Sequence, residues 1–591
     1  MFTNKEIIYK MYLLNKFYIK EMTTLGKRSL EANGRKLNWF KVFSVLIAAI
    51  LIIVLIYFSI KGIKNLNFNN NEEKDDKENN VEVSQDIDIE EKTIEQILQE
   101  FGGEVVKQVK TDTYYISKDG KDYTVYLDGE ITEGKIIPWD GTEAKPAVDE
   151  AGNINVYSAA ELAWIANQVI TGEKNFSGVT ITLRKNIDLG ARKLDNGTVD
   201  GPEWKAIVGF LDEIPDKKNT NTVSQAEVVD ENVDVTNENL KRFVGAFNGN
   251  GCSIRGMKIS SEKRYQGLFG YLSGVVSNLT IKYSYINGKE SVGAFAGLND
   301  GKIINCIADN VEVTGTEKVG GAVGIAMTDS QLENVSVYES CLVNGANNVG
   351  GIIGYTNNNV SIKGCSNGAK VKGNDYIGGI TGISFFGTTI QNSFNFSNMI
   401  EGNNYVGGLV GYSAAQIEKS HNQLLTDNNN TIKGNNYVGG IVGLNYEMGD
   451  INECFNNGTI IVTEDNCGGI VGLNSSSISN CYNKGKIECD KVTGLKIGGV
   501  CGQNLSESFI NNSYNIGTIN NSNYAGGLIG ADFGTINSSF CLDTSLKTKT
   551  SDIEYNKTIE ELKNNTLQEL GESFKVDSNG INSGFPILSW Q

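Results

Sequence analysis

Proline and histidine are almost absent from this chain of 591 residues. It contains 5 prolines, none of them between Pro215 and Pro586, and a single histidine, His421. The shortage of proline excludes collagen-like chains and proline-rich linkers. One histidine excludes metal sites that need two histidines from the same chain, and any Ser/His/Asp or Cys/His constellation would depend on His421. Glycine, by contrast, is abundant, with 68 residues.

Basic residues are fewer than acidic ones, 52 against 70, and the formal net charge is −18. An acidic surface repels phosphates, so we predict no nucleic-acid partner. Neither a P-loop nor an H-E-x-x-H motif occurs, and we predict no cofactor and no metal. Cysteine is sparse, with 10 residues, too few for a disulfide scaffold. Four cysteines share a repeat position that other repeats fill with Val or Ser, which predicts buried packing: Cys306, Cys365, Cys454 and Cys481.

Only one long hydrophobic run is present, residues 42–60, between Lys41 and Lys61. At about 1.5 Å per residue, this run is long enough to cross a hydrocarbon core of about 30 Å. Residues 1–41 contain nine Lys or Arg and three Glu, which predicts a cytoplasmic tail. We therefore predict an uncleaved signal anchor in the lipid bilayer of the cell membrane, with the bulk of the chain extracellular. A cleaved signal peptide is the alternative, but its apolar region is shorter.

Several segments separate this run from the periodic part of the chain. Residues 61–89 are rich in Asn and acids and predict a disordered spacer. An apolar helical stripe followed by turn-separated strands predicts a small α+β module over 90–140. Residues 141–265 predict an N-terminal cap and the first strands of the solenoid. The cap includes a helix that begins at the capping box of Ser158. An acidic stretch at 211–241 interrupts them and predicts a surface loop.

From residue 266 to 545 the chain is periodic. The pattern G-G-x-x-G, with two degenerate copies before it, recurs every 27 to 32 residues. Each copy is followed by a short segment of the type I-x-N-C, which ends 13 or 15 residues after the first glycine and never 14. Because side chains alternate along a strand, only an even change of length keeps the same face inward. This parity predicts strands. The first glycines of the complete copies are Gly320, Gly350, Gly378, Gly407, Gly439, Gly468, Gly498 and Gly526.

A third column of the repeat is asparagine. Stacked amides can form hydrogen bonds from one turn to the next, so this column predicts a structural ladder. The fold class predicted is all-β, a parallel β-helix or solenoid of about ten repeats of about 29 residues with helical caps. A β-propeller is the rival, but its blades need about 40–50 residues. Residues 546–591 predict the C-terminal cap. The ladder asparagines are Asn367, Asn395, Asn422, Asn456, Asn483 and Asn515.

These repeats resemble the GLUG-motif family of bacterial surface proteins, through VGGLVG (406–411), VGGIVG (438–443) and CGGIVG (467–472) followed by I-x-N-C segments. The C-terminal GFPILSWQ is also similar to the family's ending, and the resemblance covers about residues 150–591. It implies a β-solenoid on an extracellular protein, commonly in adhesive or binding regions. Some immunoglobulin-cleaving zinc metallopeptidases carry such repeats, but without H-E-x-x-H their activity does not transfer to this chain.

Two aromatic columns are the best candidates for a binding surface. Rows of exposed rings can pack on sugars or anchor a protein partner, whereas the plainer interpretation is ladder packing on the solenoid surface. His421 shares the outward position of the first column and is predicted to be a surface residue. The first column contains Phe394, Phe455, Tyr482 and Tyr514, and the second, just before the glycine strand, Tyr376, Tyr405, Tyr437 and Tyr524.

The function predicted is binding, either adhesion or scaffolding, by a membrane-anchored cell-surface protein whose partner is an unknown extracellular protein or glycan. The alternative is a carbohydrate-active enzyme of the parallel β-helix type that acts on an extracellular polysaccharide. Such an enzyme needs acids that converge in one groove. Asp375, Asp465 and Asp490 lie singly between strands and on no shared column, so we predict no catalytic residues and no enzyme activity.

Overall fold

The computed structural model describes residues 92–208, 241–423, 430–489, 496–520, 525–544 and 555–591. The predicted tail, signal anchor and spacer therefore lie outside the described residues. Within the described ranges, no helix is both long and apolar enough to cross a membrane.

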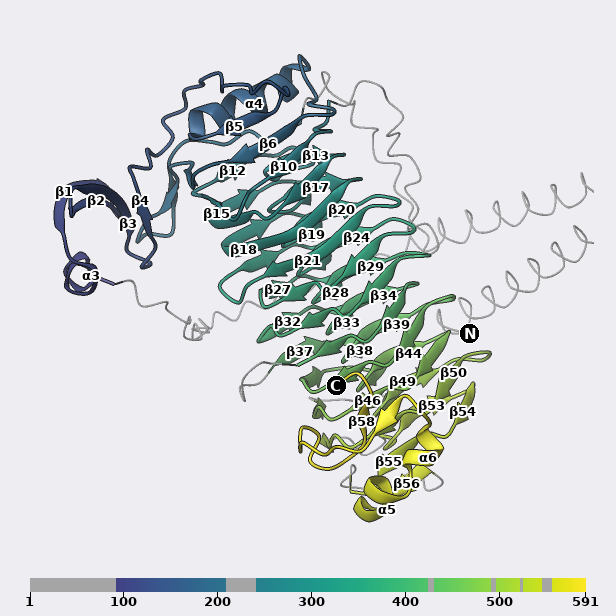
Figure 1. Ribbon diagram of the computed structural model, residues 1–591. Coiled ribbons are helices and arrows are strands. Elements are labelled where there is room, and N and C mark those ends of the chain that lie inside the picture. Colours follow the sequence, from purple (N-terminus) through teal and green to yellow (C-terminus); the bar gives the residue numbers. More distant parts are fainter. Residues whose placement is uncertain (1–91, 209–240, 424–429, 490–495, 521–524, 545–554) are drawn as a thin grey trace, which may run out of the picture. The chain divides into compact units, whose positions relative to one another are not determined.

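Long parallel sheets dominate the described chain (Figure 1). One sheet of 10 strands runs from β13 (Phe269–Leu272) to β53 (Ile529–Asp532), and one of 8 strands from β16 (Glu290–Val292) to β48 (Ile497–Gly498). A third sheet, of 32 short strands, completes each turn. The predicted parallel β-solenoid is confirmed, with about 12 turns. The turns before residue 266 add to the ten predicted repeats.

One repeat shows how the sequence forms a turn of the coil. β33 (Asn404–Gly407) is followed by β34 (Val410–Ser413), β35 (Gln416–Glu418) and β36 (His421–Asn422). Each strand pairs in parallel with its equivalent in the next turn, with Val410 opposite Val442 and Ile417 opposite Ile451. Like residues therefore stack on like residues, and the predicted parity keeps Val and Ile on the inner face.

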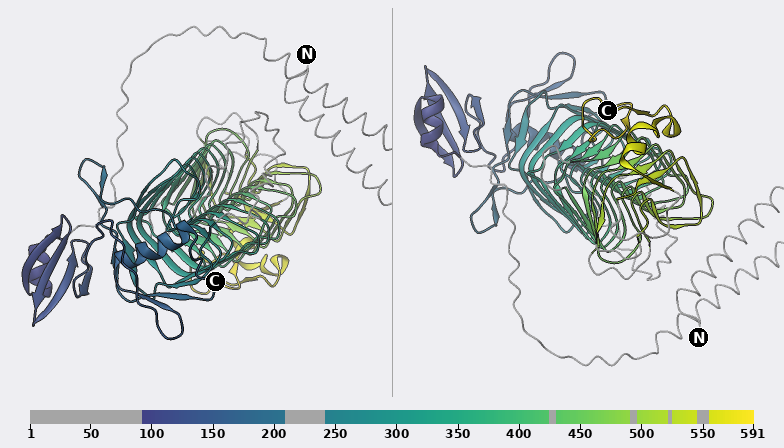
Figure 2. Two further views of the ribbon diagram at one scale, coloured as in Figure 1. Left: turned by 90° about the horizontal axis from the view of Figure 1, so that it is seen from above. Right: turned by 90° about the horizontal axis from the view of Figure 1, so that it is seen from below.

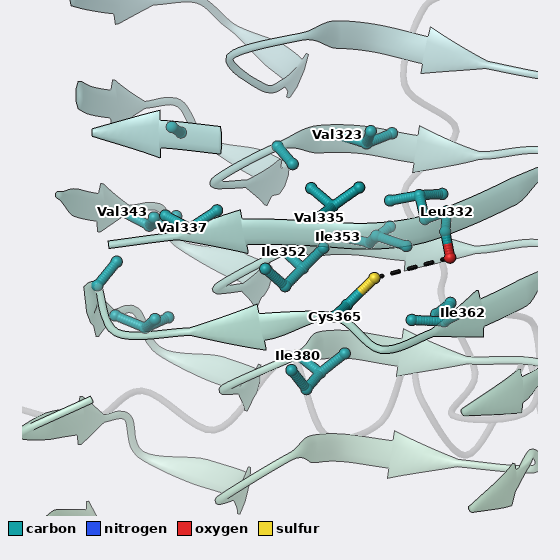
Figure 3. Packing of buried hydrophobic residues seen from close by; sticks show 14 of the residues in the cluster. Val323, Leu332, Val335, Val337, Val343, Ile352, Ile353, Ile362, Cys365 and Ile380 are labelled. Atoms are coloured by element: carbon teal, nitrogen blue, oxygen red, sulfur yellow. Dashed lines mark hydrogen bonds between the residues drawn. The ribbon is translucent and has the colours of Figure 1, made fainter. Parts of the chain in front are cut away.

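The interior is one continuous hydrophobic cluster along the solenoid axis. Val335, Val337, Ile352 and Cys365 meet there from neighbouring turns (Figure 3). Among the described residues no disulfide bond is formed, and nine of the ten cysteines are buried. The Cys365 thiol donates to the Leu332 carbonyl at 3.7 Å, and burial raises its pKa to about 12. The cysteines predicted to pack in the core do so.

The glycine pattern has a steric cause. A Cβ on Gly440 would lie closer than 3.0 Å to the carbonyl of Gly469 in the next turn and to the side chain of Asn456. A Cβ on Gly439 would collide in the same way with the carbonyl of Val442. Real Cβ atoms do not approach other atoms so closely, so both positions require glycine. At Gly440 the backbone of the next turn leaves no room, and at Gly439 the chain bends back on Val442 of its own turn.

The asparagine column lies inside the solenoid, against the second glycine of each motif. Each amide nitrogen donates to the amide oxygen in the following turn, at 2.8 to 2.9 Å over five successive steps from Asn367 to Asn515. All six side chains are fully buried. Asn456 also bonds to the backbone of Gly458 as donor and acceptor, so its polar atoms are satisfied. A second ladder, not predicted from the sequence, joins Asn445, Asn474, Asn504 and Asp532.

Helices pack near both ends of the solenoid (Figure 2). The helix α4 (Ala159–Thr171) begins at Ser158, whose side chain and that of Glu161 form the expected capping box. Its buried side chains, including Leu162 and Ile165, belong to the same core cluster as the first strands. The C-terminal helices α5 (Ile559–Asn564) and α6 (Leu567–Leu570) pack through Leu562 and Leu570 in a separate cluster.

The N-terminal module consists of one helix and an antiparallel sheet. The helix α3 (Ile94–Phe101) covers an antiparallel sheet of β1 (Glu104–Lys110), β2 (Thr113–Lys118), β3 (Lys121–Tyr126) and β4 (Ile131–Glu133). Ile97, Ile116 and Val125 form its small core.

A buried arginine joins this module to the solenoid. The side chain of Arg255 is 2% exposed and lies 3.2 Å from Asp128 and 3.4 Å from Glu130. Its guanidinium group sits 3.5 Å from the ring centroid of Tyr126. The sequence analysis missed this contact because the partners are more than 120 residues apart.

Replacing Arg255 with lysine is expected to weaken the module's attachment by about 1–2 kcal/mol. Lysine keeps the positive charge but lacks the planar guanidinium group, which can contact the carboxylates of Asp128 and Glu130 and the ring of Tyr126 at the same time. Limited proteolysis should then cleave between the module and the solenoid faster than in the parent protein. Unchanged cleavage, with Lys135→Arg on the module surface as control, would contradict the prediction.

Candidate binding surface

The first aromatic column forms a continuous stack of rings. The rings of Phe394, His421, Phe455, Tyr482 and Tyr514 lie 4.7 to 5.3 Å apart and within 10° of parallel. The register explains this arrangement, because β36, β41 (Phe455–Asn456) and β46 (Tyr482–Asn483) pair in parallel without a shift.

The C-terminal segment covers much of this stack. Asn582 donates to the Tyr514 hydroxyl at 2.7 Å, and that hydroxyl donates to the carbonyl of Pro586. The indole of Trp590 lies 5.9 Å from the rings of both His421 and Phe455.

The expectation that this column faces solvent is therefore wrong for three of its members. Phe455, Tyr482 and Tyr514 are buried, with exposed fractions of 4%, 3% and 0%. Phe394 remains partly accessible, and so does His421 beside it in the stack. The C-terminal segment returns along the solenoid and covers the other three, which the repeat pattern does not reveal.

His421 is likewise not a simple surface residue. It is stacked between Phe394 and Phe455, and burial lowers the pKa of its imidazole to about 4. Its Nδ1 atom is buried and has no hydrogen-bond partner among the described residues. The imidazole acts here as an aromatic ring, kept neutral because burial disfavours the charged form.

The second aromatic column remains half-exposed. The rings of Tyr376, Tyr405 and Tyr437 stack at 4.7 Å for each step, with interplanar angles of 5° and 4°. Burial raises the pKa of all three phenols, so their hydroxyls are neutral near pH 7. These hydroxyls form no hydrogen bond within the part of the chain that the structure describes. Tyr524 lies outside the described residues.

We refer to Tyr376, Tyr405 and Tyr437 as the tyrosine ladder. Each has a positive φ, of 62°, 56° and 56° respectively. Equivalent positions in flanking turns are Asn348 and Asn466, and asparagine tolerates this conformation well. For a bulky residue the left-handed conformation costs about 1–3 kcal/mol. Ser291 and Lys318, at the equivalent position of earlier turns, have the same positive φ, so this conformation belongs to the turn itself.

Two further tyrosines extend the ladder sideways. Tyr412 meets Tyr376 edge to face, with centroids 6.2 Å apart and planes at 77°, and Tyr446 lies 5.5 Å from Tyr412. Tyr446 is 39% exposed. Tyr412 points outward from the 10-stranded sheet, opposite Ile383 and Leu444. The sequence analysis missed both residues, although Tyr412 directly follows the last glycine of its motif.

A polar column runs beside the tyrosine ladder. Asn404 donates to Asp375 Oδ1 at 2.8 Å, and Asn436 donates to Asn404 Oδ1 at 3.4 Å. The backbone N–H of Asp465 then donates to Asn436 Oδ1 at 3.1 Å. We refer to Asp375, Asn404, Asn436 and Asp465 as the polar column. The expectation that Asp375 and Asp465 share no column is wrong, because the strand register aligns them; Asp490 lies outside the described residues.

Metal ligation has no support at this surface. In the described ranges no group of three or more His, Cys, Asp or Glu side chains could hold a metal ion. Rings, hydroxyls, amides and single carboxylates make up the site, and these groups suit non-covalent recognition.

The fold and its repeated motif define a parallel β-solenoid built from GLUG-type turns, and a comparison with protein families supports this class. The family model for the GLUG motif matches residues 434–461, which include Gly439, Gly440 and Asn456. The resemblance seen in the sequence is thereby confirmed for this repeat.

Among curated proteins, the chain is similar to halomucin from Haloquadratum walsbyi, with 29% identity over 210 residues. The match covers 33% of this chain and 2% of halomucin. Among solved structures, a Bacteroides ovatus protein provisionally described as an immunoglobulin A1 protease aligns over 76% of this chain and 96% of its own, with 15% identity and a TM-score of 0.27.

Proposed function

We propose that this chain is a membrane-anchored cell-surface protein that binds an extracellular partner, in adhesion or as a scaffold. In this proposal residues 42–60 lie in the lipid bilayer, the N-terminus is cytoplasmic, and the solenoid presents its outer face to the surroundings. The apolar run with its basic flank and the GLUG-type repeats support the proposal.

The tyrosine ladder is the observation that carries the binding function. Solvent-facing columns of a sheet are ordinarily polar, yet here half-exposed rings repeat over three turns and continue into Tyr412 and Tyr446. Exposed aromatic clusters with polar neighbours mark interaction sites on soluble surfaces.

We also propose that α4 and the C-terminal segment act as caps. A solenoid with open ends can pair with other chains, and helices that bury the terminal turns prevent this. The shared core of α4 with the first strands supports this role at the N-terminal end.

The alternative of a carbohydrate-active enzyme fits the polar column poorly. Asp375 and Asp465 are three turns apart, which is about 14 Å at about 4.8 Å per turn. Glycoside hydrolysis uses two carboxyl groups about 5–9.5 Å apart. Asn404 and Asn436 occupy the turns between the two acids.

Binding can be tested on whole cells that express the full chain. Tyr376, Tyr405 and Tyr437 are replaced together with asparagine, which Asn348 and Asn466 show to be compatible with the backbone at this position. Attachment to the natural surface or to neighbouring cells should fall at least tenfold. Tyr338→Asn, which changes a 41% exposed tyrosine elsewhere, is the control. Equal attachment of the triple variant and the control, at equal surface expression, would refute the binding role.

A further inference from the structure

We infer that the tyrosine ladder and the polar column bind a linear, uncharged polysaccharide laid along the solenoid axis. This inference rests on the proposed binding function and specifies the ligand class. It begins from the repetition of the site: the same ring and the same backbone conformation recur in three successive turns, each beside an Asp or Asn side chain of the polar column. A site that repeats by translation suits a polymer of chemically identical units.

The step between turns also fits such a polymer. Successive rings of the ladder are 4.7 Å apart, close to the length of one pyranose residue in an extended chain. Among protein partners only another β-sheet has a repeat of this length, because its strands lie about 4.7–4.9 Å apart, whereas a sugar chain repeats along its whole length. Contacts made once per turn add along the chain, so each unit contributes a similar increment of affinity.

Both chemical faces of a sugar find partners here. The stacked rings of the ladder cover one another's faces, so they offer a ligand only their edges and hydroxyl groups. The plane of the Tyr412 ring is turned by 77° relative to that of Tyr376. The surface thus offers hydroxyls and amides for sugar O–H groups and ring surface for sugar C–H groups. Neutral phenols and amides act as donors and acceptors without a change of charge.

Charge excludes polyanionic chains. Asp375 and Asp465 belong to the polar column, and the Glu464 carboxylate accepts a hydrogen bond from Asn436 within it. The Lys496 ammonium group lies 3.9 Å from the carboxylate of Asp465, at one end of the column. With a net charge of −18 for the whole chain, sulfated or uronic-acid polymers are repelled.

The test measures binding of the purified full chain, held in mild detergent, to defined oligosaccharides. The probes are β-1,4-linked glucose and N-acetylglucosamine chains of two to six units, β-1,3-linked glucose chains of the same lengths, and heparin as the polyanion. We expect affinity for one neutral series to rise with each unit up to three or four and then level off. Tyr405→Asn should lower that affinity at least tenfold, and heparin should not bind.

Two variants keep the outcome interpretable. Tyr405→Asn should change the thermal midpoint of unfolding little, because relief of the positive φ offsets the lost stacking. Tyr338→Asn should leave binding unchanged. Absence of length-dependent binding, or equal binding by Tyr405→Asn, overturns the glycan inference, and so does preferential binding of heparin.

The inference and the proposed function can fail separately. If the ladder variants lose cell attachment but the parent chain binds no neutral glycan, the surface takes a protein partner and the glycan inference is wrong. If the ladder variants instead abolish self-association in sedimentation experiments, the occupant is a second copy of this chain. Unchanged attachment together with measurable glycan binding would leave the ladder as a glycan site and refute its role in adhesion.

Discussion

Replacing Gly440 with alanine is expected to destabilise the solenoid by about 4 kcal/mol and to disrupt the turns around it. The added Cβ would overlap the carbonyl of Gly469 and the side chain of Asn456, both held by neighbouring turns. Overpacking costs about 1–3 kcal/mol, and displacing the Asn456 amide leaves buried polar atoms unpaired at a further cost of about 1–3 kcal/mol. Urea unfolding and hydrogen exchange of the surrounding strands measure the effect.

A matched control is Gly315→Ala. Its added Cβ would come closer than 3.0 Å only to methyl groups of Val292 and Val319, which can shift, while the Gly288 carbonyl would lie at an ordinary contact distance of 3.5 Å. The expected loss is therefore about 1 kcal/mol. Equal stability of the two variants would show that contact between successive turns does not impose the glycine pattern. The comparison also separates this contact from a general effect of removing glycine, because neither position has a positive φ.

Acidification is expected to destabilise the C-terminal half of the solenoid through His421. Its pKa is about 4 in the folded chain, against an ordinary value near 6.5, because burial disfavours the imidazolium ion. The stabilisation is fully present above about pH 6.5 and is lost as the pH falls toward 4. Integrated over that window, it amounts to about 3 kcal/mol.

His421→Phe should abolish this part of the pH dependence, because phenylalanine already occupies the equivalent positions 394 and 455. Urea unfolding at pH 7, 5.5 and 4.5 gives the comparison, and the nearby Trp590 supplies a fluorescence signal for the covered stack. Carboxylates also titrate in this range, so the relevant quantity is the difference between variant and parent. Identical pH dependence in both would contradict a neutral, buried His421.

The solenoid was predictable from the sequence because its determinants repeat. Gly440 and Asn456 contact each other across one turn, and the same pair recurs along the chain, so period and parity indicate strands, an inner face and a column of amides. The amide hydrogen bonds of the column join equivalent residues 27 to 34 positions apart, whereas Gly440 and Asn456 lie within one repeat. Because the same residue types recur at each position in many repeats, the sequence indicates whether that position is buried or exposed on average.

The solvent exposure of the two aromatic columns was not predictable in this way. Both consist of Tyr or Phe at regular spacing, yet Tyr482 and Tyr514 are buried while Tyr376 and Tyr405 are half-exposed. The difference comes from the C-terminal segment, whose contacts with Tyr482 and Tyr514 join residues 109 and 68 positions apart. Such contacts occur once and leave no periodic signal.

The sequence by itself determined the coil, its register and its buried asparagine ladder, because these depend on local geometry repeated in every turn. Only the tertiary structure decided which aromatic rings remain accessible, how Arg255 joins the module to the solenoid, and that Asp375 and Asp465 align. Those outcomes depend on contacts that occur once, between segments far apart in the sequence. The residues of a single repeat therefore do not indicate them. The scarcity of proline and the abundance of glycine thus describe the scaffold, whereas the proposed binding surface depends on what the non-repeating segments leave uncovered.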